Sequence, residues 1–126
     1  MTHTANFLGL DLGASSGRAV LGLFDGERLQ LKEVHRFRNG PYSVLGNLHW
    51  DALGLLDHVK QGIAAAARAS DSPLASAGLD TWGVDFGLLD ARDELLGNPY
   101  HYRDSRTDSM LEEAFKIVTK KDIFQQ

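Results

Sequence analysis

The sequence predicts an α/β fold in which a mixed sheet has helices packed against it. Near the amino terminus, three apolar runs are separated by glycine-containing turns, which is typical of antiparallel strands. A long segment with helical apolar spacing then precedes a further apolar run, as a crossover connection requires. The chain has 126 residues, a length that suits one domain.

The first three strands are predicted over residues 5–13, 17–26 and 27–40. The second run closes with Asp25 and Gly26, a dipeptide typical of tight hairpins. The third shows approximate alternation and ends at Asn39 and Gly40. Together these runs predict a three-stranded antiparallel meander.

A loop over residues 41–51 leads into a predicted helix over residues 52–70, with Asp51 as its cap. Its apolar positions recur at helical spacing and include Leu55, Leu56, Val59, Ile63 and Ala67. An Asp-Ser-Pro sequence then ends the helix.

Residues 74–90 predict a strand, a short break near Trp82 and Gly83, and another strand ending at Asp90. A turn over 91–95 and a loop over 96–107 precede a final amphipathic helix over 108–122. The apolar side of that helix would hold Met110, Leu111, Ala114, Phe115 and Val118. This order of elements is similar to the ribonuclease-H-like core of actin-like ATPases, a mixed sheet with flanking helices.

Composition excludes several classes of function. Apolar residues make up 43% and charged residues 24%, which is ordinary for a globular protein. The net charge of −4 argues against a nucleic-acid partner, and the lack of cysteine excludes thiolate metal sites and a cysteine nucleophile. No apolar run reaches the ~18 residues of a membrane span, and no signal-peptide pattern is present. We therefore expect a cytoplasmic protein with no membrane or nucleic-acid partner.

The stretch DLGASSGR, residues 11–18, lies between two predicted strands. It lacks the Gly-Lys-Ser/Thr ending of a P-loop, and no helix follows as in a dinucleotide fingerprint. What remains is a tight hairpin whose backbone N–H groups can converge on an anion, with Gly13 and Gly17 permitting positive φ. Arg18 could meet a phosphate, and Asp11 could hold a hydrated Mg²⁺ beside it. An ordinary glycine-serine turn is the alternative.

Two later stretches are also rich in chemistry. In GLDTWGVDFGLLD, residues 78–90, the polar Thr81, Trp82 and Asp85 interrupt an apolar pattern. An indole face suits the C–H face of a sugar and a carboxylate suits its hydroxyls, although a core tryptophan beside exposed aspartates is the alternative. In YHYRDSRTD, residues 100–108, aromatic and charged side chains are concentrated in one loop. Such a loop could contact a ligand, and a solvated loop held by salt bridges is the alternative.

Together with HRFRNG and LHWD, these stretches resemble the FGGY carbohydrate kinase family over nearly the whole chain, and most specifically its L-rhamnulose-phosphorylating members. The resemblance implies ATP- and Mg²⁺-dependent transfer of the γ-phosphoryl group to O1 of L-rhamnulose. The ATP-phosphate contacts that it implies are Ala14, Ser15, Ser16, Gly17 and Arg18. Asp11 would lie beside the metal. The residues that would line or neighbour the sugar pocket are Trp82, Gly83, Tyr102, Arg103 and Asp104.

Members of this family are longer than the present chain. Residues 1–126 are therefore expected to form the amino-terminal part of an incomplete first domain, without the second, adenosine-binding domain. The general-base aspartate is expected in the missing part, so no catalytic residue is assigned and the fragment alone is expected to be inactive. An uncovered sheet edge and apolar surface predict self-association.

Three other functions are weighed against this one. A non-catalytic sugar- or nucleotide-binding module on the same scaffold would retain binding without turnover. An actin-like or chaperone-like ATPase would share the phosphate hairpin, but TWGVDF and YRDSRT give it no support. A ribonuclease-H-like nuclease would need several acidic metal ligands, and only Asp11 stands at a suitable position.

Overall fold

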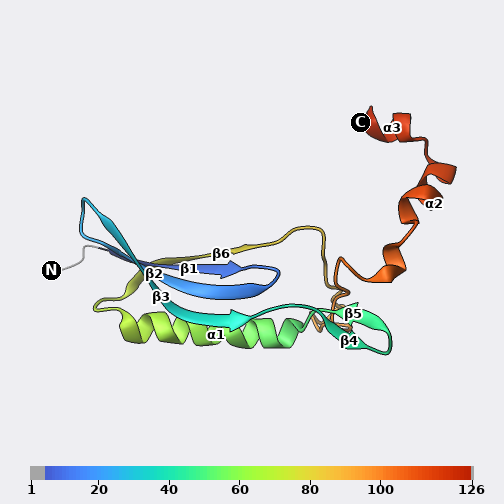
Figure 1. Cartoon of the computed structure of the whole chain (residues 1–126). Coiled ribbons are helices and arrows are strands. Elements are labelled where there is room, and N and C mark those ends of the chain that lie inside the picture. Colours follow the sequence, from blue (N-terminus) through green and yellow to red (C-terminus); the bar gives the residue numbers. More distant parts are fainter. Residues whose placement is uncertain (1–4, 126) are drawn as a thin grey trace.

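The computed structural model describes residues 5–125. A four-stranded sheet carries one long helix on one face, and the chain then runs through a loop into two short helices that lie away from the sheet (Figure 1). The strands are β1 (Ala5–Leu12), β2 (Ser16–Phe24), β3 (Leu29–Arg38), β4 (Tyr42–Val44), β5 (Asn47–His49) and β6 (Leu74–Thr81). The helices are α1 (Ala52–Ala69), the 3₁₀ turn η1 (Ser105–Thr107), α2 (Met110–Ile117) and α3 (Lys120–Phe124).

The sheet has the strand order β3-β2-β1-β6. Strands β1, β2 and β3 form the predicted antiparallel meander, whereas β6 pairs with β1 in parallel. Helix α1 is therefore the crossover that brings the chain back to the β1 edge. In this register Asp11 lies opposite Arg18 on β2 and beside Asp80 on β6.

The predicted turn between β2 and β3 is confirmed. Gly26 has a φ of 103°, and the Asp25 carboxylate accepts hydrogen bonds from the amides of Glu27 and Arg28 at 2.9 and 2.7 Å. This side-chain capping of a turn is the usual role of aspartate before glycine.

The core lies between the sheet and α1. Its buried members are Leu8, Leu10, Ala19, Leu21 and Ala66. The predicted inward face of α1 is partly wrong, because Leu56 and Ile63 are 50% and 43% exposed. The helix instead turns Gly62 and Ala66 toward the sheet, and a Cβ on Gly62 would lie 2.8 Å from the Ala19 Cβ. Small side chains allow this close approach, which leaves the larger ones at the flanks.

The predicted start of α1 is confirmed, since Asp51 Oδ1 accepts a hydrogen bond from the Gly54 amide at 2.9 Å. The loop predicted over residues 41–51 instead contains the β4-β5 hairpin. The strand predicted up to Asp90 is wrong, because only an isolated bridge joins Leu89 to Leu95. Val84 has a φ of 68°, which breaks the extended backbone directly after β6.

The predicted final helix is divided into α2 and α3. Val118 is extended, and the Thr119 hydroxyl accepts from the Asp122 amide, so a second helix cap replaces a continuous turn. The apolar side chains of this segment are exposed, as are Phe7 and Leu31 on the sheet face opposite α1. Within residues 5–125, no helix has the length and apolar character needed to cross a membrane.

Candidate functional site

The β1-β2 turn, residues 13–15, offers two main-chain donors. The Gly13 amide donates to the Ser16 carbonyl at 3.0 Å. Within residues 5–125, the amides of Ala14 and Ser15 donate to no protein acceptor. These two N–H groups are therefore available to solvent or to an external anion, as the hairpin hypothesis requires.

Gly13 and Gly17 do not adopt the positive φ that was expected from the sequence. They are needed for space instead. A Cβ on Gly17 would lie 2.1 Å from Phe37 Cζ, and a Cβ on Gly13 would lie 2.7 Å from the Ser16 carbonyl oxygen. The glycines shape the turn by letting the β3 side chain and the backbone approach closely.

Asn39, at the end of β3, fixes the same turn. Its Nδ2 donates to the Gly13 carbonyl at 2.8 Å and its backbone amide donates to the Ser15 carbonyl at 3.0 Å. The sequence pattern indicates only that Asn39 is a turn residue. No local pattern could reveal this further role, because the partners lie 26 positions apart.

Asp11 and Arg18 form an ion pair at 2.9 Å, with side chains 47% and 48% exposed. They lie on the sheet face opposite α1, in a groove that Gly78 and Asp80 also line. An exposed pair of this kind contributes little stability, so Arg18 is free to exchange Asp11 for a phosphate.

A cavity of about 600 Å³ lies between the β1-β2 turn and the loop of residues 100–108, which we call the aromatic loop. Its lining residues are Ala14, Ser15, Arg38, Asn39, Gly40, Pro41, Tyr42, His101, Tyr102 and Arg103. The structure thus brings together two of the expected phosphate contacts and two of the expected sugar contacts. Ser16, Gly17 and Arg18 do not line this cavity.

Trp50, Trp82 and His101 stack into one cluster. The Trp50 ring lies 4.2 Å from both the Trp82 and the His101 ring, measured between centroids. Asp85 Oδ2 accepts hydrogen bonds from both indoles, at 2.6 Å from Trp50 and 2.8 Å from Trp82. Asp85 thereby fixes the orientation of both rings. No role is predicted for Trp50 from the sequence, although the fragment LHWD contains it.

Tyr102 lies between two cavities, because a second one of about 400 Å³ adjoins the first. Its lining residues are Val84, Asp85, Phe86, Tyr100, His101, Tyr102, Arg106 and Thr107. Trp82 is half-buried and held by Asp85, whereas Gly83 is exposed, and a Cβ added to it would have no atom within 4 Å. Gly83 lines neither cavity but precedes Val84, which lines the second.

Asp104 anchors the aromatic loop from inside. Its carboxylate accepts from the Leu48 amide at 2.6 Å and from the Arg106 amide at 3.0 Å, and the residue is 2% exposed. The hydrogen bond from Leu48 is the main cause that lowers the pKa of Asp104. Asp104 does not line the 600 Å³ cavity; its carboxylate holds the loop that carries Tyr102, and the sugar contact implied for it stays a prediction.

We expect Asp104→Asn to lower the denaturation midpoint at neutral pH, because the charge-assisted bond to the Leu48 amide is lost. A carboxyl group whose pKa is lowered by folding contributes stability above its unfolded pKa of about 4, and that contribution is lost as pH falls from there through the lower folded pKa. The difference between the two proteins should therefore shrink below that pH. Urea titrations at pH 7 and pH 3 test this, and an equal difference at both would contradict it.

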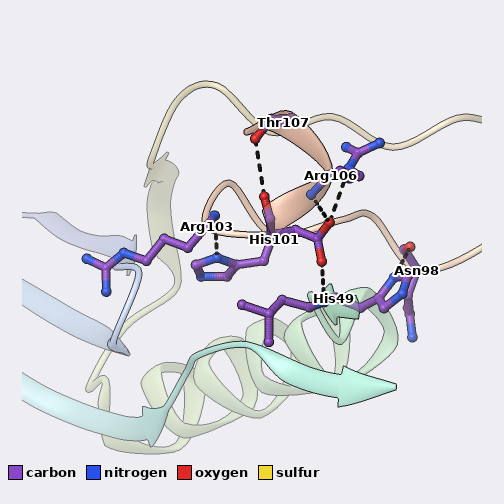
Figure 2. A network of polar contacts seen from close by, with 8 residues as sticks. His49, Asn98, His101, Arg103, Arg106 and Thr107 are labelled. Carbon is purple, nitrogen blue, oxygen red and sulfur yellow. Dashed lines mark hydrogen bonds and ion pairs between the residues drawn. The ribbon is translucent and has the colours of Figure 1, made fainter. Parts of the chain in front are cut away.

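His101 is 3% exposed and supports the same loop. Burial lowers its pKa, while the nearby Asp85 carboxylate opposes that effect. Its Nδ1 accepts from the Arg103 amide at 3.0 Å, so the neutral ring carries its proton on Nε2 (Figure 2). The imidazole is therefore a neutral donor at physiological pH.

The comparisons with known proteins agree with this geometry. No protein-family model matches the chain. A rhamnulokinase of Bacteroides thetaiotaomicron is 41% identical over 119 residues, which span 94% of this chain and 24% of that relative. A gluconate kinase structure from Lactobacillus acidophilus has a TM-score of 0.75 and 21% identity over 97% of this chain and 24% of its own. A xylulose kinase structure from Rhodospirillum rubrum has a TM-score of 0.73 and 20% identity over 92% and 24%.

The fold is therefore the mixed-sheet core of sugar kinases with the actin-like ATPase fold, and it is incomplete relative to them. The resemblance to the FGGY carbohydrate kinase family is confirmed. Among the relatives that the chain matches is the rhamnulokinase of Bacteroides thetaiotaomicron, of whose length it spans 24%.

Proposed function

We propose that this chain supplies part of the active site of a kinase that transfers the γ-phosphoryl group of ATP to O1 of L-rhamnulose. One observation carries the proposal, the shared cavity that Ala14 and Ser15 line on one side and Tyr102 and Arg103 on the other. Phosphoryl transfer depends mainly on positioning and charge neutralisation, which such a cavity can supply.

The ATP phosphates would bind the β1-β2 turn. Ala14 and Ser15 offer amides without a protein acceptor among residues 5–125, and Ser16 offers an exposed hydroxyl. Gly17 keeps the turn against Phe37 and Asn39 holds it to β3, so the donors are preorganised. Arg18 would leave Asp11 and neutralise phosphate charge.

Asp11 would be the protein ligand of a Mg²⁺ ion. This carboxylate is half-exposed, lies beside Asp80 and engages Arg18 through one oxygen only. Residues 5–125 contain no cluster of three or more metal-ligating side chains. The ion would thus be held by one or two carboxylates together with phosphate oxygens, as Mg²⁺ often is, and would neutralise phosphate charge.

The sugar would lie against Trp82 and Tyr102, near Gly83 and Arg103. The indole and phenol rings offer apolar faces to the sugar carbons, and Arg103 offers donors to its hydroxyls. Asp85 holds the Trp82 ring, and Asp104 holds the loop that carries Tyr102.

Residues 1–126 are proposed as the amino-terminal part of the first kinase domain, with the general base and the adenosine pocket supplied by a further part. The chain alone is then inactive. The alternative proposal is a non-catalytic sugar- or nucleotide-binding module. Such a module would bind its ligand as the chain alone, without a further part.

A chimera tests the proposed function. This chain would replace the matching segment of the Bacteroides rhamnulokinase, and we expect Mg²⁺- and ATP-dependent phosphorylation of L-rhamnulose. Arg18→Gln in the chimera should lower kcat/KM by about tenfold or more, since a charged phosphate contact is lost. Arg92→Gln, at an arginine 77% exposed in a distant turn, is the matched control.

Two results would overturn parts of the proposal. A folded chimera that turns over another ketose but not L-rhamnulose would refute the substrate. Turnover by the 126-residue chain alone would refute its inactivity.

Self-association and a cytoplasmic location are proposed as well. The sheet face opposite α1 exposes Phe7 and Leu31, and β6 pairs with β1 alone among the described strands, so one edge stays open. A clean monomer by light scattering at high concentration would contradict self-association. ATP as co-substrate is the support for a cytoplasmic location, and fractionation of the source cells tests it.

A further inference from the structure

Asn39 and Gly40, at the end of β3, are the only asparagine-glycine pair in the sequence. In such a pair the backbone nitrogen of glycine can attack the carbonyl carbon of the asparagine side chain, because glycine has no Cβ that hinders its approach. The other asparagines are Asn6, Asn47 and Asn98, which precede phenylalanine, leucine and proline. The sequence alone therefore distinguishes Asn39 by its chemical reactivity.

The folded chain holds the reacting groups of this pair together. The Gly40 amide donates to Asn39 Oδ1 at 2.9 Å, so the attacking nitrogen lies beside the carbonyl group that it would attack. Asn39 Nδ2, the group that would leave, donates to the Gly13 carbonyl at 2.8 Å. These two partners fix which side-chain atom is nitrogen, because an amide N–H only donates and a carbonyl only accepts.

The surroundings of the pair admit water and leave room for movement. Both residues line the cavity of about 600 Å³, and Gly40 is partly exposed. Among residues 5–125, no atom lies within 4 Å of a Cβ built on Gly40. The peptide group between Asn39 and Gly40 thus has space to turn toward the side chain.

We propose that Asn39 is a site of spontaneous deamidation that releases the β1-β2 turn. Hydroxide removes the Gly40 amide proton, the nitrogen forms a bond to Asn39 Cγ, and the bond from Cγ to Nδ2 breaks. Nδ2 takes up a proton from water and leaves as ammonia, and a cyclic imide remains. Water then adds to one of the two imide carbonyls and breaks its bond to nitrogen, which gives aspartate or isoaspartate. The net reaction consumes one water molecule, releases one ammonia molecule and involves no oxidant or reductant.

The consequence for the turn follows from the contact that is lost. The new carboxylate oxygen cannot donate a hydrogen bond, so two acceptors would face each other where Nδ2 now bonds the Gly13 carbonyl at 2.8 Å. Asn39 is 9% exposed, which limits compensation by solvent. An effect on the binding of ATP phosphates rests on the proposed function, whereas the modification itself does not.

The test incubates the 126-residue chain at mildly alkaline pH, both folded in buffer and unfolded in guanidinium chloride, and follows every asparagine by peptide mapping and mass spectrometry. In the folded chain we expect Asn39 to convert about tenfold faster or more than Asn6, Asn47 and Asn98. The products at this position should be both aspartate and isoaspartate. Their rate of formation should rise with pH, because hydroxide removes the proton.

Two variants test the effect on the turn without waiting for the reaction. Asn39→Asp, the direct product, should lower the denaturation midpoint and shift the amide NMR signals of Ala14 and Ser15. Asn98→Asp is the matched control, because Asn98 uses Oδ1 to accept from the Ala52 amide and this oxygen is kept. Its midpoint should be unchanged or higher, since the added negative charge lies at the N-terminus of α1.

The outcomes separate this inference from the proposed function. An Asn39 that stays intact in the folded chain while it converts in the unfolded chain would overturn the modification site. An Asn39→Asp variant with the midpoint and turn signals of the parent would overturn the release of the turn. None of these measurements involves ATP, a sugar or turnover, so an inactive chimera would refute only the kinase, and an inert Asn39 would refute only the modification.

Discussion

Replacing Asp85 with alanine is expected to lower the free energy of unfolding by about 3 kcal/mol, because two indole N–H donors lose their acceptor at once. Asp85 Oδ2 bonds both Trp50 and Trp82, and Trp50 is 2% exposed. Buried donors without partners are costly, so both rings should also reorient. Urea denaturation followed by circular dichroism measures the first effect, and indole N–H NMR signals report the second.

Two variants control this prediction. Asp85→Asn keeps one carbonyl acceptor, so its loss should be intermediate. Asp57→Ala removes a carboxylate whose one side-chain partner among residues 5–125 is the exposed Gln61 on α1, and it should change stability by less than about 0.5 kcal/mol. Equal stability of Asp85→Ala and the parent would show that the indoles are held by stacking alone.

Replacing Gly17 with alanine is expected to lower the free energy of unfolding by about 2 kcal/mol, since the new methyl group enters space that Phe37 fills. A Cβ there would lie 2.1 Å from Phe37 Cζ. Phe37 is 8% exposed and stacks on His58 with centroids 4.1 Å apart, so its ring cannot move without disturbing α1. The displaced turn should also bind Mg²⁺-ATP more weakly, which calorimetry can follow.

Gly78→Ala is the matched control, because a Cβ at this position on β6 has no atom within 4 Å. It should be neutral or slightly stabilising. Adding Phe37→Leu to Gly17→Ala should recover part of the lost stability, since the smaller side chain makes room. Full stability of the single Gly17→Ala variant would contradict a packing role for this glycine.

The fold was largely predictable where the signals are local. Alternating apolar residues and the Asp25-Gly26 turn predict the meander, and Asp51 predicts the start of α1. The prediction fails where contacts between distant residues decide. The sheet selects Gly62 rather than Ile63 as the buried position of α1, and the apolar spacing alone cannot distinguish them.

The sequence segments that contribute to the candidate site could be predicted, but their positions relative to one another could not. The chemistry of residues 11–18 and 100–108 is visible in the sequence, and the structure places parts of both around one cavity. The hydrogen bonds by which Asn39 fixes the β1-β2 turn were missed because they join residues far apart in the sequence. The sequence does not indicate that the Asp104 carboxylate caps two backbone amides, because one of them, that of Leu48, lies 56 positions away.

The central claim is that the β1-β2 turn presents main-chain N–H groups to a polyphosphate. Titration of the ¹⁵N-labelled chain with Mg²⁺ and a non-hydrolysable ATP analogue tests it most directly, with adenosine as the phosphate-free control. We predict that the amide signals of Ala14 and Ser15 shift with the analogue and stay in place with adenosine. Unchanged signals at both amides, while the analogue binds elsewhere or not at all, would contradict the account.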